Sequence, residues 1–148
     1  MRNYSKEEVG FIVKEFNNKT LSKSHWNHEA HIIIALWHNA IYDFDTALDF
    51  VKSKIKAYNE IVGTPNTDDS GFHETLTIFW MIFTKNYLLK NSDEELHTTI
   101  NHFLQAHADK AIPLDYYSKD ILFSKEARRI WINGNLKKII LGSDESRW

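Results

Sequence analysis

Apolar side chains recur along most of the chain at intervals of three and four positions, the spacing of one face of an α-helix. The first such stretch begins after Ser5 and Glu8, a pair that matches the capping box of a helix start, and predicts a helix over about residues 6–18. A second helix is predicted over about residues 27–42, where apolar residues surround most of the circumference. A helix of this kind belongs at the centre of a fold.

Two more helices follow in the central part of the chain. The third has Asp45 as its predicted N-cap and ends just before Gly63, because glycine suits the position after a helix. Residues 64–71 are rich in Thr, Asn, Asp and Gly and predict a loop. The fourth helix is predicted from Phe72 to about Leu89.

A second capping box, Ser92 with Glu95, predicts the start of a fifth helix that continues to His107. No segment shows the alternation of a β-strand. Beyond Pro113 the apolar pattern becomes shorter and predicts, in chain order, one or two helical turns over residues 114–122, a helix capped by Ser124 that ends near Ile132, and a frayed tail after Gly134.

The composition supports a single helical domain. The chain has 148 residues, the usual size of one domain, and no internal repeat or linker divides it. Five glycines and two prolines are too few for a turn-rich β-sandwich. We therefore expect residues 1–148 to form an all-α, single-domain bundle of five to six helices, with neighbours mostly antiparallel because the connections are short.

Charge and cysteine content narrow the classes of partner. With 18 basic and 20 acidic side chains the net charge is −2, which argues against a nucleic-acid-binding protein. The most apolar stretch, Leu76–Phe83, is far shorter than the roughly 20 residues that span a bilayer, and no secretory signal follows Met1, so we expect a cytoplasmic protein. The absence of cysteine removes disulfides and thiolate metal ligands. A small-molecule ligand is the expected partner, and the sequence defines no oligomeric state.

Four segments resemble an uncharacterised bacterial family of small helical proteins. These segments are Trp26-Asn27-His28-Glu29-Ala30-His31, Tyr58-Asn59 before Gly63, Gly71-Phe72-His73-Glu74-Thr75-Leu76-Thr77, and Ser124 to Arg128 before Trp131. Asn27 stands where the family has threonine, and a charged C-terminal end replaces a proline-containing one. The resemblance implies a helical fold and brings no activity with it, so candidate chemistry comes from the residues themselves.

Histidines gather at one predicted end of the bundle. His28 and His31 are three positions apart on a helix, so both imidazoles can approach one ion. If the second and fourth helices point the same way, their N-termini meet and bring in His73. Three imidazoles would hold one divalent transition metal, Zn, Fe or Ni, and would leave a coordination position open for water or substrate.

The same end of the bundle supplies the other candidate site residues. Glu74 points away from the ligand face and would act as the catalytic carboxylate that shuttles a proton. Tyr58 and Asn59, from the last turn of the third helix, would bind and orient a polar substrate. Arg128 is a candidate for binding an anionic group, although a basic segment of this kind is more commonly a solvated helix face. His107, at the end of the fifth helix, is expected nearby.

Two functions of different classes fit these residues. The first is metal-dependent hydrolysis of a small metabolite by the three-histidine centre. The second is a non-catalytic ligand-binding or interaction module, in which the histidines satisfy buried hydrogen bonds or His73 and Asn59 anchor a ligand without a metal. A single histidine between aromatic helices would also suffice for non-covalent haem. Four aromatic residues at helical spacing are expected to be core: Trp26, Trp37, Trp80 and Tyr87.

Overall fold

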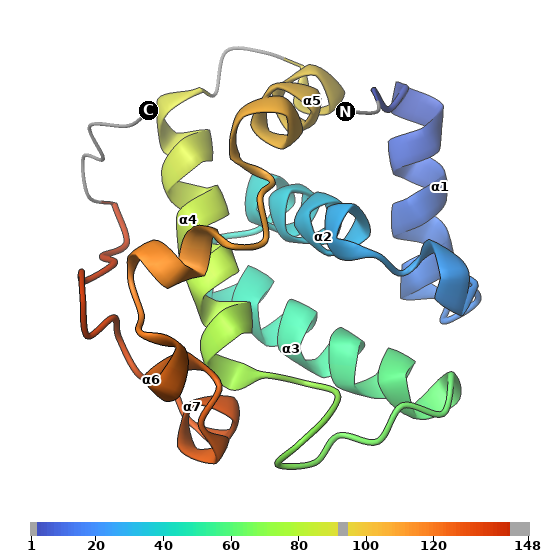
Figure 1. The fold of residues 1–148 in the computed structure, drawn as a ribbon. Coiled ribbons are helices and arrows are strands. Elements are labelled where there is room, and N and C mark those ends of the chain that lie inside the picture. The colour runs from blue at the N-terminus through green and yellow to red at the C-terminus, as the bar shows by residue number, and fades with distance from the viewer. Residues whose placement is uncertain (1–2, 92–94, 143–148) are drawn as a thin grey trace.

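Every regular element is a helix in the part of the chain that a computed structural model describes, residues 3–91 and 95–142 (Figure 1). In chain order the elements are α1 (Lys6–Asn17), the short 3₁₀ helix η1 (Lys23–His25), α2 (His28–Ile41), α3 (Phe44–Ile61), α4 (Glu74–Lys90), α5 (Leu96–His107), a second 3₁₀ helix η2 (Ile112–Asp115), α6 (Lys119–Leu122) and α7 (Lys125–Arg129). The prediction of an all-α, single-domain fold is confirmed. None of the described helices is long and apolar enough to cross a membrane.

The centre of the fold is α2, with α1, α3, α4 and α5 packed around it (Figure 1). Its side chains Ile33, Ile34 and Leu36 have no exposed surface. The predicted central position of the second helix is therefore confirmed. Because neighbours cover α2 on several sides, apolar residues around most of its circumference are needed.

Two helix starts follow the predicted capping chemistry. The Ser5 hydroxyl accepts a hydrogen bond from the Glu8 backbone N–H, and the Glu8 carboxylate accepts one from the Ser5 N–H, as the capping box requires. Asn27 caps α2 through its side-chain oxygen. The predicted box of Ser92 with Glu95 involves Ser92, which lies outside the described residues, while Glu95 is the N-cap residue of α5.

Two other starts differ from the prediction. The third helix begins at Phe44, after Asp43, so the choice of Asp45 as N-cap is wrong. Phe44 is partly buried against the core, and this packing makes the chain helical earlier than the charge pattern suggests. The fourth helix begins at Glu74, because Phe72 lies in the preceding loop, where its side chain is buried.

The C-terminal helix is shorter than predicted. We expect a helix up to Ile132 from the sequence, but α7 ends at Arg129 and the next residue is extended. The buried side chain of Thr75 accounts for this end: its hydroxyl donates to the carbonyl of Ile130 at 2.8 Å and accepts from the N–H of Ile132 at 3.1 Å. Both backbone groups are thus satisfied by α4 instead of by a helical turn.

The segment after Gly134 is also not frayed where the structure describes it. Ile139 is buried, with 2% of its surface exposed. Asn86 of α4 donates to the carbonyl of Ile140 at 3.0 Å and accepts from the N–H of Gly142 at 2.6 Å. The prediction of a frayed tail is therefore wrong for residues 135–142, because buried polar side chains of α4 supply the hydrogen bonds that a free tail would lack.

The relative direction of two helices also departs from the expectation. In Figure 1, α4 crosses α2 instead of running alongside it, so the two helices do not point the same way. The connection explains the difference: after α3 the chain passes through a loop over residues 62–73 before α4 begins. A loop of this length does not impose the antiparallel pairing that short connections do.

Candidate functional site

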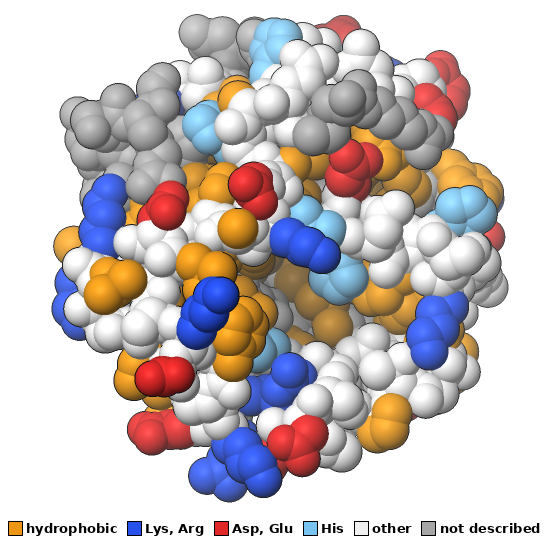
Figure 2. Space-filling view, viewed as in Figure 1, with side chains coloured by type: hydrophobic (Ala, Val, Ile, Leu, Met, Phe, Trp, Pro, Cys, Tyr) orange, Lys and Arg blue, Asp and Glu red, His pale blue; other side chains and the backbone are white. Residues whose placement is uncertain are grey.

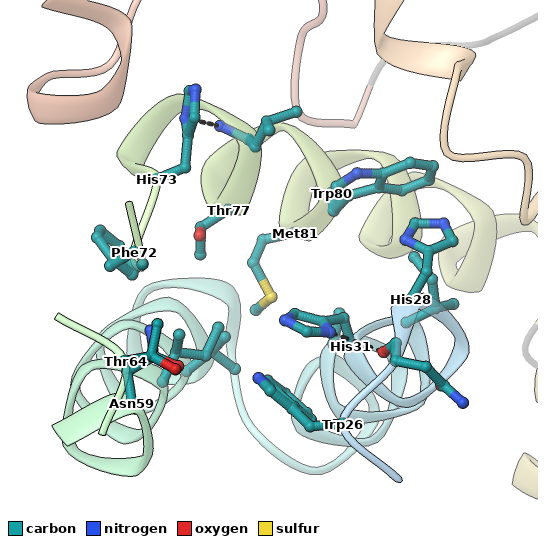
Figure 3. Close-up of a pocket in the computed structure, with 17 residues that line it drawn as sticks. Trp26, His28, His31, Asn59, Thr64, Phe72, His73, Thr77, Trp80 and Met81 are labelled. Carbon is teal, nitrogen blue, oxygen red and sulfur yellow. Dashed lines mark hydrogen bonds between the residues drawn. The ribbon is translucent and has the colours of Figure 1, made fainter. Parts of the chain in front are cut away.

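A pocket of about 500 Å³ opens between the first half of α2, the C-terminal half of α3, the loop over residues 62–73 and the first half of α4. Figure 2 shows a hollow with hydrophobic side chains at its floor and histidines at its edge. Three aromatic side chains contribute to its wall: Trp26, Phe72 and Trp80 (Figure 3). The other lining residues are Asn27, His28, His31, Ile32, Ala35, Val51, Ile55, Asn59, Thr64, Gly71, His73, Leu76, Thr77 and Met81.

Four residues chosen from the sequence meet in this pocket. They are His28 and His31 from α2, Asn59 from α3, and His73 from the start of α4. The grouping arises although α2 and α4 cross, because the loop before α4 brings its first turns back over α2 and α3. His107 does not line the pocket; its ring packs against aromatic residues of α4 and α5.

Three other candidates lie outside the pocket lining. The Tyr58 side chain is fully buried, and its hydroxyl donates to the carbonyl of Leu21 at 2.7 Å, so it joins α3 to the segment before α2. Glu74 accepts a hydrogen bond from the Lys52 ammonium at 2.7 Å, which links α4 to α3. Arg128 donates to two backbone carbonyls of the loop before α4. In this structure all three hold elements together.

His31 is part of a stack of three rings. The Trp26 indole lies between Phe16, at a centroid distance of 4.6 Å, and His31, at 3.7 Å. His31 Nδ1 donates to the carbonyl of Asn27 at 2.8 Å, because a carbonyl can only accept. The other nitrogen faces the pocket in Figure 3. Trp26, expected in the core, thus packs on the core with one face and supports a pocket residue with the other.

The electrostatics around His31 favour its neutral form. Desolvation lowers its pKa, and the hydrogen bond to Asn27 raises it by a smaller amount. The Trp26 ring stacks on His31 and contributes to this desolvation, although the side chain also keeps an exposed edge toward solvent. A neutral imidazole with its proton on Nδ1 leaves Nε2 as a hydrogen-bond acceptor.

His28 lies deeper, with its ring against the edge of Trp80 at a centroid distance of 5.2 Å. Burial lowers its pKa; a hydrogen bond with the Ala108 backbone raises it, and the nearby charge of Lys110 lowers it further. Its Nε2 is buried and has no hydrogen-bond partner. A buried nitrogen without a partner at the wall of a pocket is available to a bound molecule.

His73 has no nitrogen available. Its Nδ1 accepts from the backbone N–H of Leu76 at 3.1 Å, which makes it the N-cap of α4, and its Nε2 donates to the carbonyl of Leu122 at 2.9 Å. In Figure 3 the ring turns away from His28 and His31. Burial lowers its pKa, and the charge of Arg128 also contributes to the lowering. His73 therefore joins α4 to the C-terminal part of the chain.

These orientations bear directly on the expected metal centre. Among residues 3–91 and 95–142, no three side chains of His, Asp or Glu are placed to hold one ion. His28, His31 and His73 share a pocket but do not converge on one point, and both nitrogens of His73 bond to backbone. The side chains as they lie therefore do not form the three-ligand centre expected from spacing.

The pocket wall includes a loop held by a residue that the sequence analysis missed. Asn66 Oδ1 accepts from the N–H of Phe72 and from Asn59 Nδ2, each at 3.0 Å, while Asn66 Nδ2 donates to the carbonyl of Lys56 at 3.1 Å. The bonds with Asn59 and Lys56 tie the loop to α3, and the bond from Phe72 joins the two ends of the loop to each other. The available signal was an asparagine after proline in a polar loop, a residue type that often bonds to nearby backbone.

Gly71→Ala is expected to destabilise the protein by about 1–3 kcal/mol. Gly71 has φ +75°, which disfavours other residues, and a Cβ there would lie far inside van der Waals contact with the carbonyl of Pro65. Urea unfolding measures the effect. The matched control is Gly10→Ala in α1, where a Cβ meets no neighbour and helix propensity should add about 0.5–1 kcal/mol of stability. Equal effects of the two changes would contradict the loop geometry.

No protein-family model, no curated protein and no solved structure matches the chain. The family resemblance drawn from the sequence receives no support from these comparisons. What can be inferred about the function of this small all-helical protein therefore comes from the pocket.

Proposed function

We propose that the protein binds a small, largely apolar molecule in the pocket between α2, α3 and α4. The observation that carries this proposal is the composition of the wall: aromatic rings, a methionine and aliphatic side chains surround a space of about 500 Å³, with a few neutral polar groups among them. Small-molecule sites have this character and typically occupy about 300–1,000 Å³.

Two observations favour a pocket without a metal over metal-dependent hydrolysis. His73 has both ring nitrogens bonded to backbone, so it would have to break the cap of α4 to bind an ion. Glu74, the candidate proton shuttle, is paired with Lys52 outside the pocket lining. His28 and His31 alone are fewer than the three protein ligands that a catalytic zinc takes.

Filling the pocket is expected to abolish binding. Thr77 points into the cavity in Figure 3, so Thr77→Phe would occupy space that a ligand needs. The probes are small fragments, such as indole and cyclohexanol, and binding is measured by ligand-observed NMR. We expect the wild type to bind the aromatic probe and Thr77→Phe to weaken this binding about tenfold or more, while its melting temperature stays within a few degrees.

The matched control is Thr46→Phe, a half-buried position of α3 that does not line the pocket. Thr46→Phe should bind the probes as the wild type does. If no probe binds the wild type, or if Thr77→Phe binds as well as Thr46→Phe does, the pocket is not a ligand site.

Removing divalent metals is expected to leave the melting temperature unchanged. A metal bound only to the folded state, at a hundredfold excess over its Kd, would add about 2.7 kcal/mol of stability, or roughly 5–11 °C for a domain of this size. The measurement is a thermal melt with EDTA and after addition of Zn²⁺, Ni²⁺ or Fe²⁺. If EDTA lowers the melting temperature by several degrees and a single metal restores it, the result would support metal-dependent hydrolysis over a pocket without a metal.

A further inference from the structure

We propose that the ligand of this pocket is a neutral, planar aromatic molecule that carries an N–H or O–H donor on its edge, as in an indole or a phenol, and that His31 Nε2 and Asn59 Oδ1 accept the hydrogen bonds of such donors. This inference rests on the proposed function and specifies its ligand class. It follows from two hydrogen-bond networks behind the pocket wall. These networks determine whether His31 and Asn59 present a donor or an acceptor to a molecule in the pocket.

The first network determines the orientation of His31. The carbonyl of Asn27 can only accept, so His31 Nδ1 carries the proton in the 2.8 Å bond between them. The Asn27 side chain caps α2, and stacking on Trp26 positions the ring plane, so both the partner and the ring are held in place. The free lone pair is then on Nε2, which faces the pocket in Figure 3.

The second network determines the orientation of Asn59. Asn66 must present its oxygen to the N–H of Phe72 and its amide nitrogen to the carbonyl of Lys56, since neither backbone group can reverse its role. The Asn59 atom that meets Asn66 Oδ1 at 3.0 Å is therefore its Nδ2. This leaves Asn59 Oδ1 as a second acceptor for a molecule in the pocket, in addition to the buried Nε2 of His28, which has no partner.

The wall also defines the shape and charge of the occupant. Phe72 and Trp80 present aromatic surfaces, against which a planar ring buries more area than a branched chain does. None of the described residues that line the pocket is Lys, Arg, Asp or Glu. A carboxylate would enter without a charged partner and would meet the two acceptors, and burying an unpaired charge is costly. A neutral donor avoids both penalties.

The test compares probes of matched shape, with affinities from amide chemical shifts of isotope-labelled protein. Indole and benzothiophene have nearly the same size, but only indole has an N–H. We expect indole to bind about tenfold or more tightly, since bound benzothiophene would cover the acceptors and displace their water without supplying a donor. Phenol should likewise bind more tightly than benzoate, which has a ring of the same size and a negative charge.

The second part of the experiment replaces one of the acceptors. His31→Phe keeps a ring on Trp26 but removes one of the two acceptors, so the preference for indole over benzothiophene should shrink. The matched control is His25→Phe, an exposed position outside the pocket, which should keep the wild-type preference.

The outcomes separate the two proposals. If indole and benzothiophene bind wild type equally, the donor class is wrong and the pocket remains a ligand site. If His31→Phe keeps the full wild-type preference for indole, the assignment of His31 as an acceptor is wrong. Tighter binding of benzoate than of phenol would overturn the neutral class. If none of the four probes binds but cyclohexanol does, only the aromatic ligand class is wrong, whereas if cyclohexanol also fails to bind, the proposed function is wrong as well.

Discussion

His73→Ala is expected to lower the free energy of unfolding by about 2–4 kcal/mol. The change removes the N-cap of α4, typically worth about 0.5–2 kcal/mol, and leaves the carbonyl of Leu122 without its donor, a loss of about 1–3 kcal/mol for a buried group. His73 is itself buried, so water does not readily replace it. In a thermal melt the loss corresponds to roughly 4–16 °C.

A second variant separates the two contributions. Asparagine is a good N-cap but is too short to reach Leu122, so His73→Asn should recover about 1 kcal/mol of the loss. The control is His102→Ala, an exposed position of α5, which should change stability by no more than about 0.5 kcal/mol. A loss below 1 kcal/mol in His73→Ala would show that the ring does not hold α4 to the C-terminal part of the chain.

The helices were predictable because their signals are local. The capping box of Ser5 and Glu8 works within one turn, and the apolar run around Ile33 identifies α2 as central without knowledge of its neighbours. The start of α3 was not predictable in the same way. Asp43 and Asp45 are equally plausible caps by residue type, and the burial of Phe44 in the tertiary structure decides between them.

The sequence indicated which residues lie near one another in the candidate site but not how their side chains are oriented. His28, His31, Asn59 and His73 do line one pocket, but the loop before α4 brings them together, and not the expected common direction of α2 and α4. The directions of the His28 and His73 imidazoles depend on partners far along the chain, Trp80 and Leu122, which spacing alone does not reveal. His73 precedes the helix with φ −125° and ψ 108° instead of lying in its first turn, and this backbone turns its ring away from the other two histidines.

The structure of the C-terminal segment was also not predictable from its own sequence, because it depends on contacts with α4. The helical pattern shortens beyond Pro113, so the segment after Gly134, considered alone, favours a frayed tail. Thr75 and Asn86 of α4 supply hydrogen bonds to this segment, and their role becomes visible only when the segment lies against the helix. Polar residues at buried positions of an apolar helix are the signal that could have indicated a partner.

A buried histidine outside the pocket makes stability depend on pH. His38 has no exposed surface; its Nδ1 donates to the carbonyl of Ile34 at 2.8 Å and its Nε2 accepts from the Lys54 ammonium at 2.8 Å. Burial lowers the pKa of His38 from its ordinary 6.5 to about 4; the bond to Ile34 raises it by a smaller amount and the charge of Lys54 lowers it further. The folded state therefore holds this ring neutral.

Lowering the pH from 7 to 4 is expected to remove about 3 kcal/mol of stability through His38 alone. The unfolded chain binds a proton at this residue near pH 6.5, whereas the folded protein binds it only near pH 4. The contribution of His38 to stability is therefore fully present above pH 6.5 and is lost as the pH falls toward 4.

Urea unfolding of His38→Gln measures this contribution. The glutamine oxygen can still accept from Lys54, and the pH dependence of stability should be smaller by about this amount. The control His102→Gln, at an exposed position, should retain the wild-type dependence. Equal dependence in the wild type and His38→Gln would mean that the folded protein accepts a proton on His38 as readily as the unfolded chain does, contrary to its complete burial and its bond with Lys54.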